Sequence, residues 1–100
     1  MTEAGSIPGQ AFASVWNALE DSPADAANMR MRSELMIAIR QAVAEWDVTQ
    51  AAAARRLEVT QPRLNDLLRG RINNFSLDAL TVLAARSVLD VHMRIERAAA

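Results

Sequence analysis

The sequence predicts an all-α fold of five helices, followed by one short β-strand at the C-terminus. Apolar residues recur at three- and four-residue spacing along most of the chain, which is the pattern of amphipathic helices. A serine or threonine precedes each helical segment from residue 22 onward, where it can cap free backbone N–H groups. Only residues 91–96 alternate between apolar and polar side chains, and this alternation is typical of a strand.

The composition favours a single small domain, because the chain has 100 residues and an apolar fraction of 51% made largely of alanine. Only two Phe and two Trp add aromatic bulk, so we expect an additional interface to contribute stability. The absence of cysteine excludes a disulfide scaffold and thiolate chemistry, and it fits a reducing compartment. No segment resembles a signal peptide or a membrane span, which predicts a cytoplasmic protein.

Local patterns divide the chain into three segments. Residues 1–11 contain glycine and proline without periodicity, and we expect them to form a disordered leader. Residues 12–89 form the predicted helical domain, and residues 90–100 form a separate tail. The domain opens with a short amphipathic helix, whose apolar face either packs on the core or docks on a basic partner. That face consists of Phe12, Val15, Trp16 and Leu19.

A longer helix is predicted from the start signal at Ser22, Pro23 and Asp25 to about Trp46. Its first turns are only weakly periodic and form either an extension or a break. Its later turns keep a continuous core face. That face consists of Leu35, Met36, Ile39, Val43 and Trp46.

Residues 49–69 predict two short helices joined by a tight turn. Thr49 caps a helix over Gln50–Leu57, and Thr60 caps a second helix that has a proline in its first turn. Glu58 and Val59 leave room only for a sharp reversal. In the second helix three leucines form a buried stripe, and the polar side chains point outward. The stripe is Leu64, Leu67 and Leu68, and the outward residues are Gln61, Arg63, Asn65, Asp66 and Arg69.

Two such helices, with a polar and basic face on the second, fit the major groove of double-stranded DNA. Gly70 follows the second helix as its C′ residue. The alternative is an ordinary helical hairpin, but a bundle needs no cluster of Gln, Arg and Asn on one exposed face.

Ser76 and Asp78 then start a last helix that closes the domain. Its inward residues are Leu77, Leu80, Leu83 and Ala84.

The segment from Gln50 to Gly70 resembles the helix-turn-helix of the Xre and Cro/phage-repressor family. The resemblance rests on Ala54 at the helix crossing, Val59 in the turn, Leu64 and Leu67 as packing positions, and the Thr60-Gln61 opening of the second helix. A wider set of segments, SVWNALED, MRMRSELM, TQPRLNDLLRGR and FSLDAL, is similar to HigA-type antitoxin-like regulators. That second resemblance covers most of the chain.

These resemblances imply a compact phage-repressor-like fold and a sequence-specific DNA-binding transcriptional regulator that acts as a repressor. The HigA-type resemblance implies an alternative, in which an antitoxin neutralises a small ribonuclease toxin by direct binding and represses its own operon. The chain departs from the family at Glu58, where the family often has glycine. If this residue is left-handed, a side chain there costs on the order of 1 kcal/mol.

The charge distribution favours nucleic-acid binding although the formal net charge is only −1. Residues 1–29 hold four carboxylates and no basic residue, whereas residues 49–75 hold five arginines and two carboxylates. Every basic residue in the chain is arginine. Arginine suits bidentate contacts to phosphate or guanine, although a genome-wide compositional bias explains this choice equally well.

Helix faces and the family resemblance assign roles to individual side chains. Gln61 is the candidate for a bidentate adenine contact, and Arg63 either reads guanine or grips phosphate. Asp66 either accepts from a cytosine amino group or pairs with Arg63 or Arg69. The candidate base contacts are Gln61, Arg63, Asn65 and Asp66, and the candidate phosphate contacts are Gln50, Arg69 and Arg71.

The C-terminal tail predicts a homodimer. Val91, Met93 and Ile95 alternate with polar residues, and a strand in a helical chain finds its natural partner in the same strand of a second copy. The alternative is a frayed helical tail, since residues 84–100 also contain good helix formers. A dimer can read a pseudo-palindrome with half-sites about 34–36 Å apart, or a multiple of that spacing.

Enzymatic activity is not expected. The single histidine, His92, lies on the predicted strand, and without cysteine there is no ligand set for zinc and no thiol nucleophile. The carboxylates are scattered along solvent faces. The sequence therefore predicts no catalytic residue, no metal site, no cofactor and no membrane contact.

Overall fold

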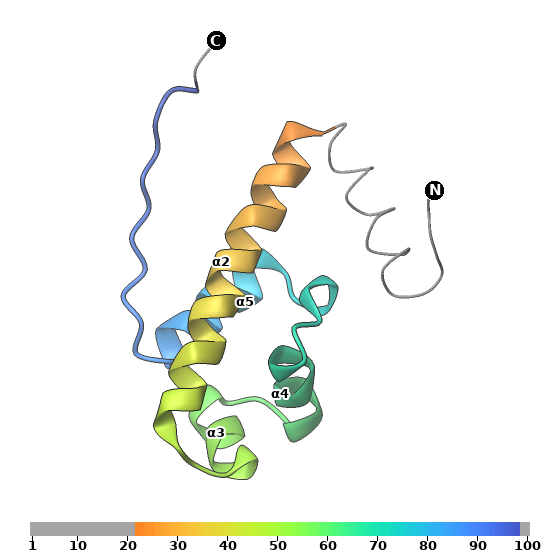
Figure 1. The fold of residues 1–100 in the computed structure, drawn as a ribbon, viewed down its shortest axis with the longest axis vertical. Helices are drawn as coiled ribbons and strands as arrows, with labels where there is room; N and C mark the ends of the chain where they lie inside the picture. Colours follow the sequence, from red (N-terminus) through yellow and green to blue (C-terminus); the bar gives the residue numbers. More distant parts are fainter. Residues whose placement is uncertain (1–21, 99–100) are drawn as a thin grey trace, which may run out of the picture. The chain divides into compact units, whose positions relative to one another are not determined.

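A computed structural model describes residues 22–98, and within this range the chain folds into four α-helices and one short 3-10 helix. The predicted leader and the predicted helix over residues 12–19 lie outside the described residues. The boundary between the two units of the chain falls after residue 31, within the helix that begins at Pro23. The elements are α2 (Pro23–Trp46), α3 (Gln50–Leu57), α4 (Gln61–Leu68), η1 (Ile72–Asn74) and α5 (Leu77–Arg86) (Figure 1).

The start of α2 lies where the sequence predicts it. Ser22 caps the helix, because its Oγ accepts a hydrogen bond from the Asp25 N–H at 3.3 Å and its carbonyl accepts from the Ala26 N–H at 3.0 Å. Asp25 places a negative charge in the first turn, which favours the positive end of the helix dipole. The weakly periodic early turns form an extension of the helix, since α2 continues without a break to Trp46.

The core of the second unit lies between the later turns of α2 and the three following helices, which gather around it (Figure 1). Leu57, Leu64 and Leu80 are fully buried, so α3, α4 and α5 each contribute a leucine to the same core. Leu68 is only partly buried, unlike the other two leucines of the predicted stripe. The buried set is Met36, Ile39, Val43, Ala53, Ala54, Leu57, Leu64, Leu67, Phe75, Leu80, Leu83 and Ala84.

The N-terminal caps of α3, α4 and α5 confirm the local sequence reading. Thr49 Oγ1 accepts from the Ala52 N–H at 3.1 Å, and Thr60 Oγ1 accepts from the Arg63 N–H at 3.2 Å. Ser76 Oγ accepts from the Ala79 N–H at 3.0 Å. Each cap satisfies a backbone donor that the first turn of a helix leaves free, and together they fix where the three helices begin.

The reversal between α3 and α4 is made by a left-handed residue. Glu58 has φ 59° and ψ 42°, and the N–H of Val59 donates to the Ala54 carbonyl at 3.0 Å. This backbone geometry ends α3 in the way a C-terminal glycine usually does. Among residues 22–98, the Glu58 carboxylate is engaged only by an ion pair with Arg86 at 3.7 Å, and its side chain is 69% exposed.

The predicted C-terminal strand and the five-helix count are not supported. Residues 89–98 form an open chain without regular secondary structure beyond α5 (Figure 1). A strand exists only where its backbone forms a ladder with another strand, and no such partner lies among residues 22–98. The helical alternative for the tail is wrong as well, because α5 ends at Arg86.

We predict that Glu58→Gly stabilises the protein. Glycine relieves about 1–2 kcal/mol of left-handed strain and costs roughly 0.5–1 kcal/mol in chain entropy, which leaves a gain of up to roughly 1.5 kcal/mol. The exposed ion pair with Arg86 contributes little to stability. Urea unfolding measures the difference, with Glu58→Ala as the control that loses the same ion pair but keeps the strain. Equal midpoints for the two variants would contradict the role given to the left-handed backbone.

Candidate nucleic-acid interface

The exposed face of α4 carries two unoccupied amide side chains. Thr60 fixes the first turn, and the buried Leu64 and Leu67 fix how the helix is rotated about its axis. Gln61 therefore lies exposed at the first helical position, and Asn65 lies one turn later, partly exposed. Within the described part of the chain, no side-chain hydrogen bond engages either amide. Both remain available for contacts outside the protein.

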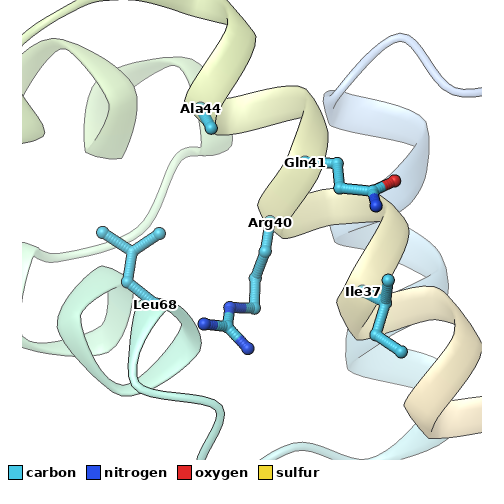
Figure 2. A pocket seen from close by; sticks show the side chains of 5 residues that line it. All are labelled: Ile37, Arg40, Gln41, Ala44 and Leu68. Carbon is cyan, nitrogen blue, oxygen red and sulfur yellow. The ribbon is translucent and has the colours of Figure 1, made fainter.

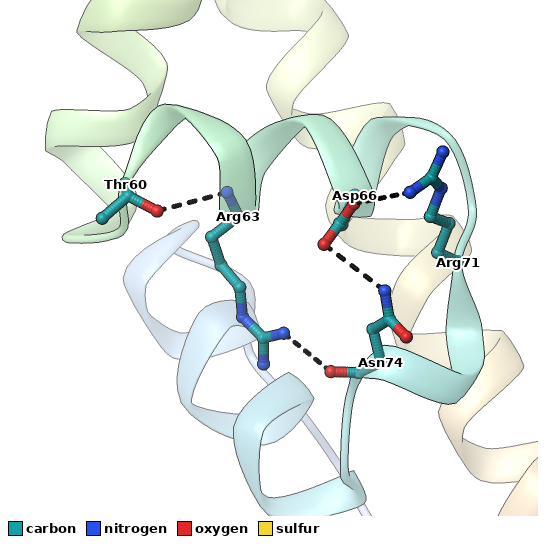
Figure 3. A network of polar contacts seen from close by, with 5 residues as sticks. All are labelled: Thr60, Arg63, Asp66, Arg71 and Asn74. Carbon is teal, nitrogen blue, oxygen red and sulfur yellow. Dashed lines mark hydrogen bonds and ion pairs between the residues drawn. The ribbon is translucent and has the colours of Figure 1, made fainter.

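Arg63 points toward the chain that follows α4 (Figure 3). Its Nη1 donates to the Asn74 carbonyl oxygen at 2.7 Å, and its guanidinium carbon lies 3.9 Å from the centre of the Phe75 ring. Arg63 thus links α4 to η1 by a charge-assisted hydrogen bond and a cation–π contact. Its role as a base contact stays a prediction, but the structure gives the side chain partners of its own.

Asp66 also has internal partners. Its Oδ1 accepts from Arg71 Nη1 at 3.3 Å, and its Oδ2 accepts from Asn74 Nδ2 at 3.4 Å (Figure 3). The sequence pattern predicts pairing with Arg63 or Arg69, whereas the carboxylate binds Arg71, which lies beyond the end of the helix. With 26% of the side chain exposed, Asp66 is the centre of a partly buried polar network. Its predicted base contact competes with that network.

The candidate phosphate contacts lie at two ends of the helix pair. Gln50 is exposed at the first residue of α3, where the helix dipole favours an anion. Arg69 and Arg71 flank Gly70 just after α4, and both are exposed. Gly70 has φ 73°, which confirms the predicted left-handed end of the helix. The Arg71 side chain stays 52% exposed beside Asp66, so part of its guanidinium still faces solvent.

Two further arginines hold this region in place, and the sequence pattern does not identify them. Arg32 Nη1 donates to the carbonyl oxygens of Ile72 and Phe75 at 3.1 and 3.3 Å. Arg86 Nη1 donates to the Leu57 carbonyl at 3.1 Å, at the end of α3. Both contacts join residues far apart in the sequence, so no local spacing could have predicted them. They anchor the chain on either side of α4.

Other functional classes find little support among the described residues. No group of three or more His, Asp or Glu side chains within residues 22–98 could hold a metal ion. None of the helices described here is both long and apolar enough to cross a membrane.

Comparison with known proteins identifies the fold. A model of the family described as "Helix-turn-helix domain" matches residues 18–96. The chain belongs to this helix-turn-helix family. A solved structure named "Putative XRE Family Transcriptional Regulator" is similar to the chain with 31% sequence identity and a TM-score of 0.68, and the match covers 76% of this chain and 91% of the other. No curated protein matches the sequence.

These findings confirm the Xre-like helix-turn-helix prediction. The assignment of α3 and α4 as the two helices of the motif stays a prediction from the sequence. They support DNA binding and transcription regulation as the general function of this helix-turn-helix protein. The HigA-type subgroup stays a prediction from the sequence.

We predict that Arg63→Ala lowers the free energy of unfolding by about 1–2 kcal/mol, because it removes a charge-assisted hydrogen bond and a cation–π contact. Arg69→Ala is the control, since it removes one arginine charge at the other end of α4 without breaking a described contact. We expect that control to change stability by no more than about 0.5 kcal/mol. Chemical denaturation compares the two variants. If the Arg63 variant were as stable as the Arg69 variant, the contacts of Arg63 with η1 and Phe75 would contribute nothing to the free energy of unfolding.

Proposed function

We propose that this protein is a cytoplasmic, sequence-specific transcriptional repressor that binds double-stranded DNA with α4 in the major groove, and that it is not an enzyme. The observation that carries the proposal is the pair of unoccupied amides, Gln61 and Asn65, on the exposed face of a helix whose rotation is fixed by buried leucines. Glutamine and asparagine can each form two hydrogen bonds to the major-groove edge of adenine. Membership in the helix-turn-helix family supports the same role.

Gln61 and Asn65 are the principal base-reading residues in this proposal. Arg63 and Asp66 are secondary, because each must first exchange its partner in the polar network for a base. Such an exchange is favourable only where a hydrogen bond to DNA replaces the internal hydrogen bond that is lost. Arg63 and Asp66 therefore modify the DNA sequence preference that Gln61 and Asn65 establish. Gln50, Arg69 and Arg71 bind phosphates and set the register of the helix on the duplex.

The repressor acts as a homodimer in this proposal. Val91, Met93 and Ile95 are 50, 79 and 84% exposed on the open tail, which leaves a row of apolar side chains without a cover. The same segment of a second copy supplies both a backbone ladder and an apolar surface. Two copies of α4 related by a two-fold axis then read the two halves of a pseudo-palindrome.

The antitoxin alternative rests on the sequence resemblance and on the apolar face over residues 12–19, which lies outside the described residues. It requires a small ribonuclease as partner. Co-expression with a neighbouring gene product of basic composition tests it directly, and joint purification at micromolar concentration is the expected result if the alternative holds.

We predict that Gln61→Ala and Arg71→Ala change DNA binding in different ways. Selection from random duplexes should return a different preferred sequence for Gln61→Ala, because a base contact is lost. Arg71→Ala should weaken binding to all sequences and reduce the slope of log affinity against log salt by about one. Identical selection profiles and salt slopes for both variants would contradict the division into base and phosphate contacts.

We predict that charge on the apolar face of the tail abolishes dimerisation. The variant with aspartate at Val91, Met93 and Ile95 should sediment as a monomer, because the paired tails would bury three carboxylates in each copy. The matched control replaces His92, Arg94 and Glu96 with alanine, on the other face of the same segment, and should remain dimeric. A dimer that survives in both variants would place the interface elsewhere.

A further inference from the structure

Arg40 on α2 lies beside the turn that follows α4. Its Nη1 is 3.2 Å from the position that a Cβ atom at Gly70 would take, and Figure 2 shows the guanidinium reaching from α2 toward the chain after Leu68. Arg40 is exposed. Among residues 22–98, no carboxylate lies within ion-pairing distance of it. An exposed guanidinium therefore faces the same turn that Arg69 and Arg71 flank.

The surface around Arg40 is an open pocket of about 370 Å³. Its lining combines the guanidinium and one amide with apolar side chains, and the full set is Ile37, Arg40, Gln41, Ala44 and Leu68 (Figure 2). A DNA strand presents a similar alternation, since each anionic phosphate is followed by a largely apolar deoxyribose. The guanidinium and the Gln41 amide suit a phosphate, and Ala44 and Leu68 suit the adjoining sugar.

This pocket continues toward Gln50. Ala44 and Leu68 also line a second pocket of about 330 Å³, to which Gln50, Asp47 and Val48 contribute. We refer to these two adjoining pockets as the furrow; Arg40 lines the first, and Gln50, at the start of α3, lines the second. The Asp47 carboxylate repels an anion in the second pocket, so the favourable position for a phosphate in the furrow is beside Arg40.

We infer that Arg40 binds a backbone phosphate of the DNA and that the furrow between α2 and α4 seats one strand beside the major groove. This inference rests on the proposed function, because it assumes that α4 enters the groove. It extends the phosphate-binding set from the helix-turn-helix to α2. Arg40 then lies beside the turn at Gly70, which the exposed Arg69 and Arg71 flank in the sequence and where Asp66 forms an ion pair with Arg71.

Salt-dependent binding tests the inference. The probe is a fluorescent duplex of about 20 base pairs of mixed sequence, titrated with full-length protein across a series of salt concentrations. Arg40→Gln should weaken binding several-fold at low salt and reduce the slope of log affinity against log salt by about 0.9, the value for one phosphate contact. Arg40→Lys should restore most of the slope, since it keeps the charge. Unchanged thermal melting shows that the Gln variant is folded.

The matched control is Arg55→Gln. Arg55 is exposed on α3 and has no ion-pair partner among the described residues, so its replacement makes the same change in net charge. The control should keep the wild-type slope. The inference would be overturned if Arg40→Gln and Arg55→Gln both kept the wild-type slope while Arg71→Ala lowered it. That result would leave the proposed DNA binding intact, and the pocket beside Arg40 would then fit a protein partner. Failure of the wild-type protein to bind the duplex at any salt concentration would reject both proposals.

Discussion

The structure depends on how closely α3 can approach its neighbours. Ala53 and Ala54 are buried where α3 packs against α4 and α5, and Leu57 fills the core at the end of the helix. Small side chains at such a crossing let two helix backbones come near each other, and a larger residue would force them apart. Because α4 begins only four residues after α3 ends, any shift of α3 would also turn the exposed face of α4. The direction in which Gln61 points is therefore set by alanines on the preceding helix.

Arginine has two different tasks in this protein. Arg32, Arg63 and Arg86 donate to backbone carbonyls around the helix pair, and they hold the ends of α3 and η1 in place. Such side chains are less available to an external anion, because each internal hydrogen bond must be broken first. The count of arginines in residues 49–75 is therefore larger than the number that are free to contact DNA. Near the turn at Gly70, Arg40 adds an exposed guanidinium from a different part of the sequence.

Local chemistry made the helix boundaries predictable. Thr49, Thr60 and Ser76 cap donors three residues ahead, so the evidence for each cap lies within four consecutive residues. The hydrogen-bond partners of the long side chains could not be predicted in this way, because Arg63 binds a carbonyl 11 residues away in a segment without regular periodicity. The position of Arg40 depends on the packing of α2 against α4, which no local spacing encodes.

The end of α5 explains why the tail leaves the domain as an open chain. Val88 adopts φ 62° although it is β-branched, a costly conformation for such a residue. The N–H of Leu89 donates back to the Ala84 carbonyl at 3.1 Å, and the Leu89 side chain packs against the core. These two contacts offset the strain and direct the chain away from the helix axis. If α5 continued, Val88 would lose its strain but Leu89 would leave the core. The helix therefore ends here, and residues 90–98 extend beyond it without backbone hydrogen bonds to the described residues. The proposed homodimer pairs this open segment, in which apolar and polar residues alternate.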